Sequence, residues 1–405
     1  MGYPDAMKFP LWPLIATTAM QTVATMAAYT VPALAPVIAS DLGVDGALTG
    51  YFVSVVYGVG IASSLLAADF IHRYGAVRVG QLMLASALAM LLISAYGGLA
   101  ALALGAIALG IGYGAAAPVS THLLVPRTPP RIVNLVLSIR QIGVPLGGVL
   151  GALLLPPIAL GIGWQNTFLL QALPVVLMLV LLELPRRRWD RRTEDDSTSA
   201  APSGQQRGLR QLAGLLRTSA QLRRLTLASF VYSGTQLCFV AFTTVQLTSR
   251  AEFGLIAAGQ ALATYQVCGV VSRPIWGWIA DTRVPARWLL VFQGFTMALA
   301  AGAAGQFGPG WPVPLVLLVC AIAGATASGY TGIAYSEFAR LGGARRTEAT
   351  GLGSAAMFAG VLALPSLATV LITTSGSYGL AYGVVGAMAA GAGLLLATGG
   401  RYGKS

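Results

Sequence analysis

The chain has 405 residues, of which 56% are hydrophobic and only 9% are charged. A soluble domain carries about 25% charged residues, so this composition excludes an ordinary water-soluble protein. The net charge of +12 would suggest a nucleic-acid partner in a soluble chain. Here the basic residues lie between apolar blocks, so membrane topology explains them better and no nucleic-acid partner is expected.

Apolar blocks of about 20 or more residues recur along the chain, and each is long enough to cross a bilayer as a helix. They predict an all-α polytopic membrane protein with twelve transmembrane spans. The spans are expected at 11–38, 47–70, 77–96, 98–123, 132–157, 164–184, 225–248, 255–280, 287–307, 313–337, 349–374 and 378–398. The start, "MGYPDAMKFPLWP", leads straight into a full-length span, so no cleavable signal peptide is expected.

The longest hydrophilic insert divides the spans six and six. It predicts an N-terminal six-helix bundle at 1–184, a cytoplasmic linker at 185–224 and a C-terminal six-helix bundle at 225–405. The segment "RRTEDDSTSAAPSGQQRG" is typical of a disordered linker. The following "LRQLAGLLRTSAQLRRL" fits either a basic amphipathic helix on the membrane surface or a solvated connection.

The distribution of charge predicts the orientation of the chain. With a cytoplasmic N-terminus, the outer loops hold Asp41, Asp45 and Glu252 but only one basic residue, Arg250. Nearly all other lysines and arginines then lie in or beside cytoplasmic segments, as the positive-inside rule requires. We therefore expect a multi-pass protein of the plasma (inner) membrane with both termini in the cytoplasm.

The two halves of the sequence repeat each other at a constant interval. "LLAAD" ends at Asp69 and "GWIAD" ends at Asp281, while "GGVLGALLLPP" starts at Gly147 and "AGVLALP" at Ala359, and both intervals are 212 residues. Duplicated halves are common in transporters, whose substrate site lies near the bilayer midplane at the interface between the repeats.

Twelve spans, a central loop and these repeats resemble the major facilitator superfamily over essentially the whole chain. The signature of that family between spans 2 and 3 is Gly-x-x-x-Asp-Arg-x-Gly-Arg-Arg, and it often recurs between spans 8 and 9. The second copy here is good, whereas in the first Leu65 replaces the glycine and the basic part is delayed to "HRYGAVR". The resemblance implies that these loops latch the inward-closed state of a rocking transporter. The residues concerned are Gly277, Asp281, Arg283, Asp69, Arg73 and Arg78.

Spans 4 and 5 resemble other motifs of this superfamily less closely. "GIGYGAAAP" in span 4 is similar to the fourth-helix motif, but Ala106 stands where that motif has an arginine. "GVPLGG" in span 5 is similar to the antiporter signature, with one extra valine. Glycine and proline at these positions equally serve helix packing and bending.

Two arginines lie deep within predicted spans. Arg273 is eight residues from the end of span 8 at Asp281, and Arg140 is nine residues beyond Arg131 in span 5, which places both about 12–13 Å deep. No aspartate or glutamate lies at a comparable depth in the sequence, so an anionic ligand bound in bidentate fashion would explain both. The alternative is that each arginine snorkels or bonds backbone carbonyls. In the family fold, helices 5 and 8 are neighbours, which implies that both arginines approach one cavity.

A local resemblance favours a carboxylate substrate. "RPIWG" is similar to the eighth-helix segment of monocarboxylate transporters, whose arginine meets the substrate carboxylate, which implies that role for Arg273. Two features depart from that family: Gly269 stands where it has an acidic residue, and its first-helix signature is absent.

Neutral polar side chains predict the rest of a cavity lining. Gln21, Thr25 and Tyr29 recur every four residues and therefore share one face of span 1. Each such residue could equally make an interhelical hydrogen bond. The further candidates are Tyr113, Gln141, Tyr232, Gln236, Tyr265 and Tyr330.

Few residues suggest other chemistry. His122 is a candidate for proton coupling because it can titrate near neutral pH, although a structural or solvated role is equally open. The three cysteines lie in apolar blocks, and two histidines without motif spacing predict neither a metal site, nor a cofactor, nor a hydrolytic triad. "GGRYGKS" and "GIGYG" lack the strand-to-helix context of nucleotide-binding loops.

The leading hypothesis from the sequence is a secondary transporter, not an enzyme, for a small organic anion with a carboxylate group. Coupling to protons and a monomeric state are expected. Two alternatives stay open: an exporter of hydrophobic compounds from the same superfamily, and a non-transporting membrane receptor.

Overall fold

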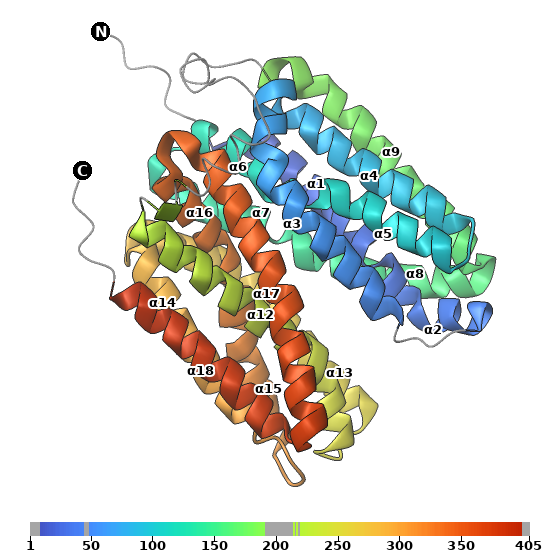
Figure 1. Ribbon diagram of the computed structural model, residues 1–405, viewed down its shortest axis with the longest axis vertical. Helices are drawn as coiled ribbons and strands as arrows, with labels where there is room; N and C mark the ends of the chain where they lie inside the picture. Colours follow the sequence, from blue (N-terminus) through green and yellow to red (C-terminus); the bar gives the residue numbers. More distant parts are fainter. Residues whose placement is uncertain (1–8, 44–47, 191–213, 215, 218, 399–405) are drawn as a thin grey trace. The chain divides into compact units, whose positions relative to one another are not determined.

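The computed structural model describes residues 9–43, 48–190, 214, 216, 217 and 219–398. Most of the linker expected at 185–224, from 191 to 213, and the last residues of the chain, 399–405, lie outside this range. By its contacts the chain forms two compact units (Figure 1). Unit 1 comprises residues 1–129, 140–212 and 342–355, and unit 2 comprises 130–139, 213–341 and 356–405.

Unit 1 is built mainly from the helices of the first half. These are α1 (Leu11–Ala28), α2 (Thr30–Leu42), α3 (Leu48–Tyr74), α4 (Ala76–Ala95), α5 (Leu99–Tyr113), α6 (Ala116–Leu124), α8 (Gly143–Ile162) and α9 (Trp164–Trp189). Helix α4 packs between α5 and α9, α3 packs on α5, and α1 packs on α8. Figure 1 shows α4 and α9 running side by side.

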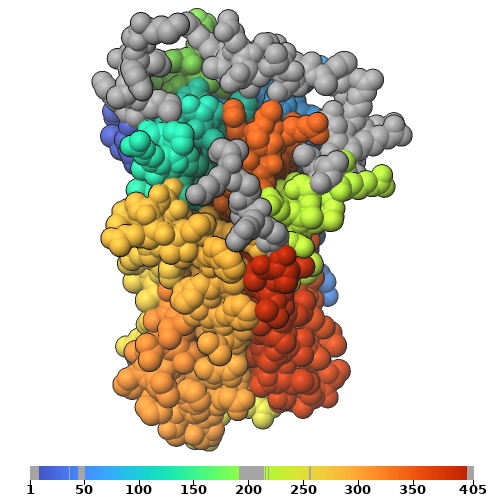
Figure 2. Space-filling model, turned by 90° about the vertical axis from the view of Figure 1, so that its left-hand side faces the viewer, coloured from blue at the N-terminus to red at the C-terminus, as the bar shows by residue number. Residues whose placement is uncertain are grey.

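Unit 2 holds most of the second half. Its helices are α7 (Val133–Arg140), α12 (Ala220–Ser249), α13 (Leu255–Thr282), α14 (Ala286–Ala304), α15 (Val313–Ala323), α16 (Thr331–Gly342), α17 (Arg346–Ser375) and α18 (Tyr378–Ala397). A π-helical turn, Gly324–Ser328, joins α15 to α16. Figure 2 shows α14 (gold to orange) beside α18 (red) on one face of this unit.

Two helices begin in one unit and end in the other. The first residues of α7, up to Ile139, belong to unit 2, whereas Arg140 belongs to unit 1. The first turns of α17, up to Ala355, belong to unit 1, and the helix continues in unit 2 from Ala356.

Each predicted span coincides with a helix or a broken pair of helices. Within the described residues, nine helical stretches are long and apolar enough to cross a membrane, and one of them, Val313–Ser375, includes two of the predicted spans. The remaining predicted spans are helical as α1–α2 and α13. The fold is therefore that of an all-α, multi-pass membrane protein.

The outer face of α9 shows why this fold suits a bilayer. Leu173, Leu177, Val180 and Leu184 recur every three or four residues and are all exposed. The opposite face of the helix, which includes Phe168, is buried in the unit. An exposed apolar stripe of this length would be a liability in water and is stable only against lipid.

Four of the predicted spans are interrupted rather than continuous. The first breaks at Tyr29, the fourth at Gly114, the fifth at Gln141, and the tenth in the π-helical turn. Breaks release backbone groups from the helical ladder, so other donors and acceptors must satisfy them.

Candidate functional site

Arg140 lies directly before the break between α7 and α8. Only 3% of the surface of this residue is exposed. The guanidinium donates to Oε1 of Gln141 (2.5 Å), to Oε1 of Gln21 (2.8 Å) and to the backbone carbonyl of Ala116 (2.8 Å). These three acceptors, from α1, α6 and the break itself, fix the orientation of the guanidinium.

A chain of polar contacts extends this site through unit 1. Gln21 Nε2 donates to Thr25 Oγ1 (2.8 Å), and that hydroxyl shares a hydrogen bond with the Tyr113 hydroxyl (3.3 Å). The Tyr113 ring packs edge-on against Tyr57, with 6.1 Å between ring centroids, and Tyr29 lies within electrostatic range of Tyr57. The structure thus joins five residues that the sequence proposes for the site: Arg140, Gln141, Gln21, Thr25 and Tyr113.

Arg273 occupies a similar setting on α13 in unit 2. It is 2% exposed, and it donates through Nε to the carbonyl of Ser328 (3.1 Å) and through Nη2 to Oγ of Ser328 (3.0 Å). A Cβ at Gly269, one turn away, would lie 2.7 Å from the Ser328 side chain, so this glycine permits the close approach. Tyr265 and Tyr330 lie within electrostatic range of Arg273.

The other predicted residues of unit 2 make interhelical contacts. The Tyr265 hydroxyl donates to the carbonyl of Gln236 (3.3 Å), and the Tyr232 hydroxyl donates to the carbonyl of Leu290 (2.9 Å). The rings of Tyr232 and Tyr330 pack edge-on with centroids 5.5 Å apart. These contacts correspond to the packing role that the sequence left open for each tyrosine.

The two arginines bind equivalent backbone positions in the two halves. The 212-residue interval of the repeat relates Ala116, whose carbonyl accepts from Arg140, to Ser328, whose carbonyl accepts from Arg273. Both carbonyls lie at helix interruptions, after Gly114 and at the end of the π-helical turn. Interrupted helices with exposed backbone groups commonly form the substrate sites of transporters. Each arginine therefore donates to a backbone carbonyl beside a helix interruption.

A second set of contacts holds the start of α7. The Asp281 carboxylate at the end of α13 accepts from the backbone N–H of Leu135 (2.8 Å) and from the backbone N–H (3.2 Å) and Nδ2 (2.8 Å) of Asn134. A carboxylate at this position caps a helix N-terminus and complements its dipole. A Cβ at Gly277 would lie 2.7 Å from Leu135 Cα, so this glycine lets the two backbones meet. Arg283 stacks over Trp278 (5.9 Å).

A family model described as Major Facilitator Superfamily matches residues 17–340. The chain belongs to this superfamily. It is accordingly a membrane transporter and not an enzyme.

Two curated relatives are similar over part of this facilitator. The 4-hydroxybenzoate transporter PcaK of Acinetobacter baylyi is 30% identical over 155 residues, which cover 37% of this chain and only a third (33%) of the relative. The purine ribonucleoside efflux pump NepI of Escherichia coli is 25% identical over 312 residues, which cover 73% of this chain and 72% of the relative.

Solved facilitators share the fold over almost the whole chain. The fucose:proton symporter FucP of E. coli aligns with a TM-score of 0.75 and 13% identity, covering 96% of this chain and 99% of the other. The proton:xylose symporter XylE aligns with a TM-score of 0.71 and 15% identity, covering 95% and 94%. At such low identity these structures establish the fold alone.

The first copy of the facilitator signature makes different contacts from the second. Asp69 lies within electrostatic range of His72 and Glu348. His122 Nδ1 shares a hydrogen bond with Thr347 Oγ1 (3.1 Å) in the first turn of α17. The guanidinium of Arg73 lies over the ring of the neighbouring Tyr74, 5.2 Å from its centroid.

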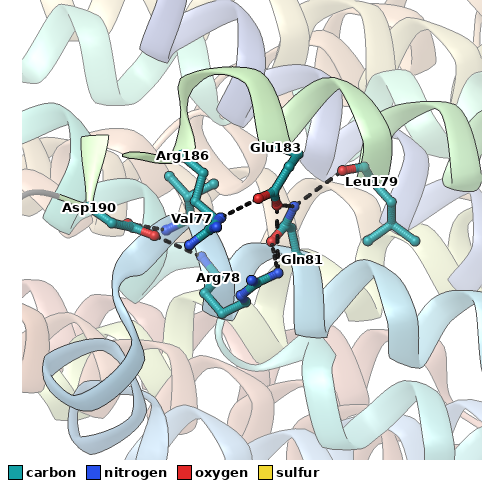
Figure 3. A network of polar contacts seen from close by, with 7 residues as sticks. All are labelled: Val77, Arg78, Gln81, Leu179, Glu183, Arg186 and Asp190. Carbon is teal, nitrogen blue, oxygen red and sulfur yellow. Dashed lines mark hydrogen bonds and ion pairs between the residues drawn. The ribbon is translucent and has the colours of Figure 1, made fainter. Parts of the chain in front are cut away.

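A polar network at the same end of unit 1 includes residues that the sequence analysis did not single out (Figure 3). Asp190 accepts from the backbone N–H groups of Val77 (2.8 Å) and Arg78 (3.3 Å), and thus caps α4 from the end of α9. Burial raises the pKa of the Asp190 carboxyl, and these two backbone bonds oppose that rise. The signal that could have revealed it is the left-handed Gly75 (φ +91°), whose missing Cβ leaves room for this carboxylate.

Charged side chains complete this network. Glu183 accepts from Gln81 (2.9 Å) and Arg186 (2.6 Å), and lies 3.6 Å from Arg78 (Figure 3). The predicted gating residue Arg78 therefore helps to join α4 to α9 within unit 1.

Proposed function

We propose that this facilitator is a secondary active transporter that moves a small organic anion by alternating access, and that it recognises a carboxylate group. The observation that carries the proposal is the pair of buried arginines, each donating to a backbone carbonyl at one of two repeat-related helix interruptions. An arginine near the centre of a membrane helix costs about 2.5–3.5 kcal/mol, which a bidentate carboxylate partner would offset.

One relative supports the chemistry of the substrate. PcaK is named for 4-hydroxybenzoate, an aromatic carboxylate, and is 30% identical over part of this chain. Tyr113, which shares a hydrogen bond with Thr25, and Tyr57, which packs against Tyr113, would offer an aromatic surface for such a ring.

The proposal includes an orientation and a cycle. The ends of α3 and α13 that carry Asp69 and Asp281 would face the cytoplasm of the plasma membrane, as would both termini. Two bundles, at 1–184 and 225–405, would rock about the substrate while these two ends latch the inward-closed state. Proton coupling, with His122 as a candidate, and a monomeric state complete the proposal.

Transport by purified protein in proteoliposomes tests the arginines. Arg140→Gln and Arg273→Gln should each lower uptake of labelled 4-hydroxybenzoate or lactate by at least about tenfold, because a charge-assisted hydrogen bond contributes about 1.5–3 kcal/mol. Arg287→Gln is the matched control, since Arg287 is also buried in unit 2 but donates to the carbonyl of Leu396 at the end of α18 (2.7 Å). The control should lower thermal stability and leave the apparent affinity unchanged. Normal uptake by both test variants would refute the anion proposal.

An exporter of uncharged compounds is the second candidate, because NepI, named as a purine ribonucleoside efflux pump, is similar over 73% of this chain. An exporter of this kind should confer resistance to toxic purine ribonucleoside analogues when overproduced. That resistance should persist in Arg140→Gln and Arg273→Gln, which separates the two candidates.

A further inference from the structure

Both histidines of the chain lie in one cluster of unit 1. His72 is near the end of α3, and its Nε2 lies 3.4 Å from Oε1 of Glu348 in the first turn of α17. His122 on α6 packs edge-on against His72 with centroids 6.1 Å apart, and it shares a hydrogen bond with Thr347, the neighbour of Glu348. Side chains from α3 and α6 thus hold the start of α17 through titratable groups.

Glu348 is the most constrained member of this cluster. Its side chain is 17% exposed, and within the described part of the chain its Oε2 atom is buried without a hydrogen-bond partner. A buried carboxylate is stabilised by a positively charged partner, which a protonated His72 would supply. Asp69 is a second carboxylate within electrostatic range, while Arg345 and the adjacent Arg346 bring positive charge from the α17 side.

We propose that His72 and Glu348, flanked by Asp69 and His122, form a proton-binding site that ties α3 to the first turn of α17. A proton on His72 converts its contact with Glu348 into a charge-assisted pair. An unperturbed histidine titrates at about pH 6.5, so the link tightens as the pH falls through this region and loosens as it rises. Because His122 packs against His72, a second positive charge on His122 is disfavoured while His72 is protonated.

The repeat-related contact in unit 2 differs from this histidine–glutamate pair, and the difference supports a pH-dependent role for the pair in unit 1. There the equivalent aspartate, Asp281, caps the start of α7 directly through backbone N–H groups, which do not titrate. In unit 1 the link runs instead between side chains, from His72 on the helix of Asp69 to Glu348 in the first turn of α17. The link in unit 1 therefore includes a histidine, a residue type that commonly titrates near neutral pH, whereas the contacts of Asp281 given above include none.

The consequence for the transport cycle rests on the proposed function. Helix α17 changes unit after Ala355, so release of its first turns would free the whole helix to move with unit 2. The test below measures the link itself and uses no substrate, so its outcome is independent of the anion assignment.

Hydrogen exchange of the amides at 346–355, in the full chain in lipid nanodiscs, tests the proposal. Wild type and variants are compared at the same pH, so that the intrinsic pH dependence of exchange cancels. At pH 5.5, His72→Gln and Glu348→Gln should each exchange about two- to fivefold faster than wild type, as expected for a partly exposed ion pair. At pH 8 the His72→Gln variant and wild type should be equal. His72→Arg, which keeps the charge, should exchange slowly at both values.

Glu183→Gln is the matched control, because it removes a carboxylate from the other polar network at this end of unit 1. It should leave the exchange of 346–355 equal to that of wild type at pH 5.5. The proposal is overturned if His72→Gln matches wild type at pH 5.5, or if it exchanges faster by the same factor at pH 8.

Discussion

Gly277 and Gly259 lie on the same helix, α13, in contrasting surroundings. A Cβ at Gly277 would lie 2.7 Å from Leu135 Cα and 2.8 Å from the Asn134 carbonyl, whereas a Cβ at Gly259 would meet nothing within 4 Å. The same chemical change at these two positions therefore isolates the contact between α13 and the start of α7.

We expect Gly277→Ala to destabilise the protein by about 1–3 kcal/mol, because the added methyl overpacks a contact with backbone atoms that cannot easily move. Gly259→Ala should be neutral or stabilising by up to about 1 kcal/mol, because alanine favours the helix. Chemical denaturation in detergent measures both. Equal stability of the two variants would show that the approach of α13 to α7 is looser than described.

Tyr57 and Asp190 show what sequence patterns miss at the residue scale. Arg140, Gln21 and Thr25 were predictable because charge and polarity are conspicuous in an apolar span and their helical spacing is regular. Tyr57 packs against Tyr113 on another helix, and Asp190 caps a helix more than a hundred residues away in the chain. Contacts of that kind depend on tertiary packing, which periodicity does not encode.

At the scale of single helices, the positions of the breaks are what the sequence did not predict. The helical segments that coincide with the predicted spans could be predicted because each is a long apolar block. Their breaks could not, because glycine is frequent throughout these blocks and Gly114, at a break, looks like Gly105 or Gly110, inside a helix. Tyr29, Tyr113, Gln141 and Tyr330 were proposed for their polarity, and each lies at or beside such a break.

Trp276 and Trp278 allow a test of the π-helical turn. The Trp276 indole donates to the carbonyl of Ala325 (2.6 Å), a group inside that turn. We expect Trp276→Phe to cost about 1–3 kcal/mol, since it leaves this carbonyl without its donor away from water. Trp278→Phe, on the same helix but exposed, should cost much less.

Thermal unfolding in detergent, followed by circular dichroism, compares the two tryptophan variants. A lower midpoint for Trp276→Phe alone would agree with the assigned hydrogen bond. Matching midpoints would mean that the turn does not need the indole.

At the scale of the whole molecule, the proposed orientation can be measured directly. Gln306 follows α14 and Thr282 ends α13, and both are exposed at opposite ends of α14. In a background without native cysteines, Gln306→Cys should react with a membrane-impermeant maleimide in intact cells, because the charge asymmetry predicts that its loop lies outside.

Thr282→Cys should react only after the membrane is permeabilised. The reverse pattern would invert the orientation and place both proposed latches outside the cell. Modification of both cysteines in intact cells would mean that the reagent had entered the cells. A cytosolic marker protein with a reactive cysteine detects such entry.

The two helices that pass from one unit to the other differ in construction. The boundary in the fifth span falls at Ile139 and Arg140, next to the break between α7 and α8, whereas α17 is unbroken where it crosses at Ala355 and Ala356. The first crossing is thus a break at which the chain can bend, and the second is a continuous helix. If a substrate carboxylate binds Arg140, it binds directly beside this break, so ligand binding and bending of the fifth span would be coupled. Helix α17 has no break at its crossing, so it can move only as a rigid helix or by losing the histidine contacts of its first turn.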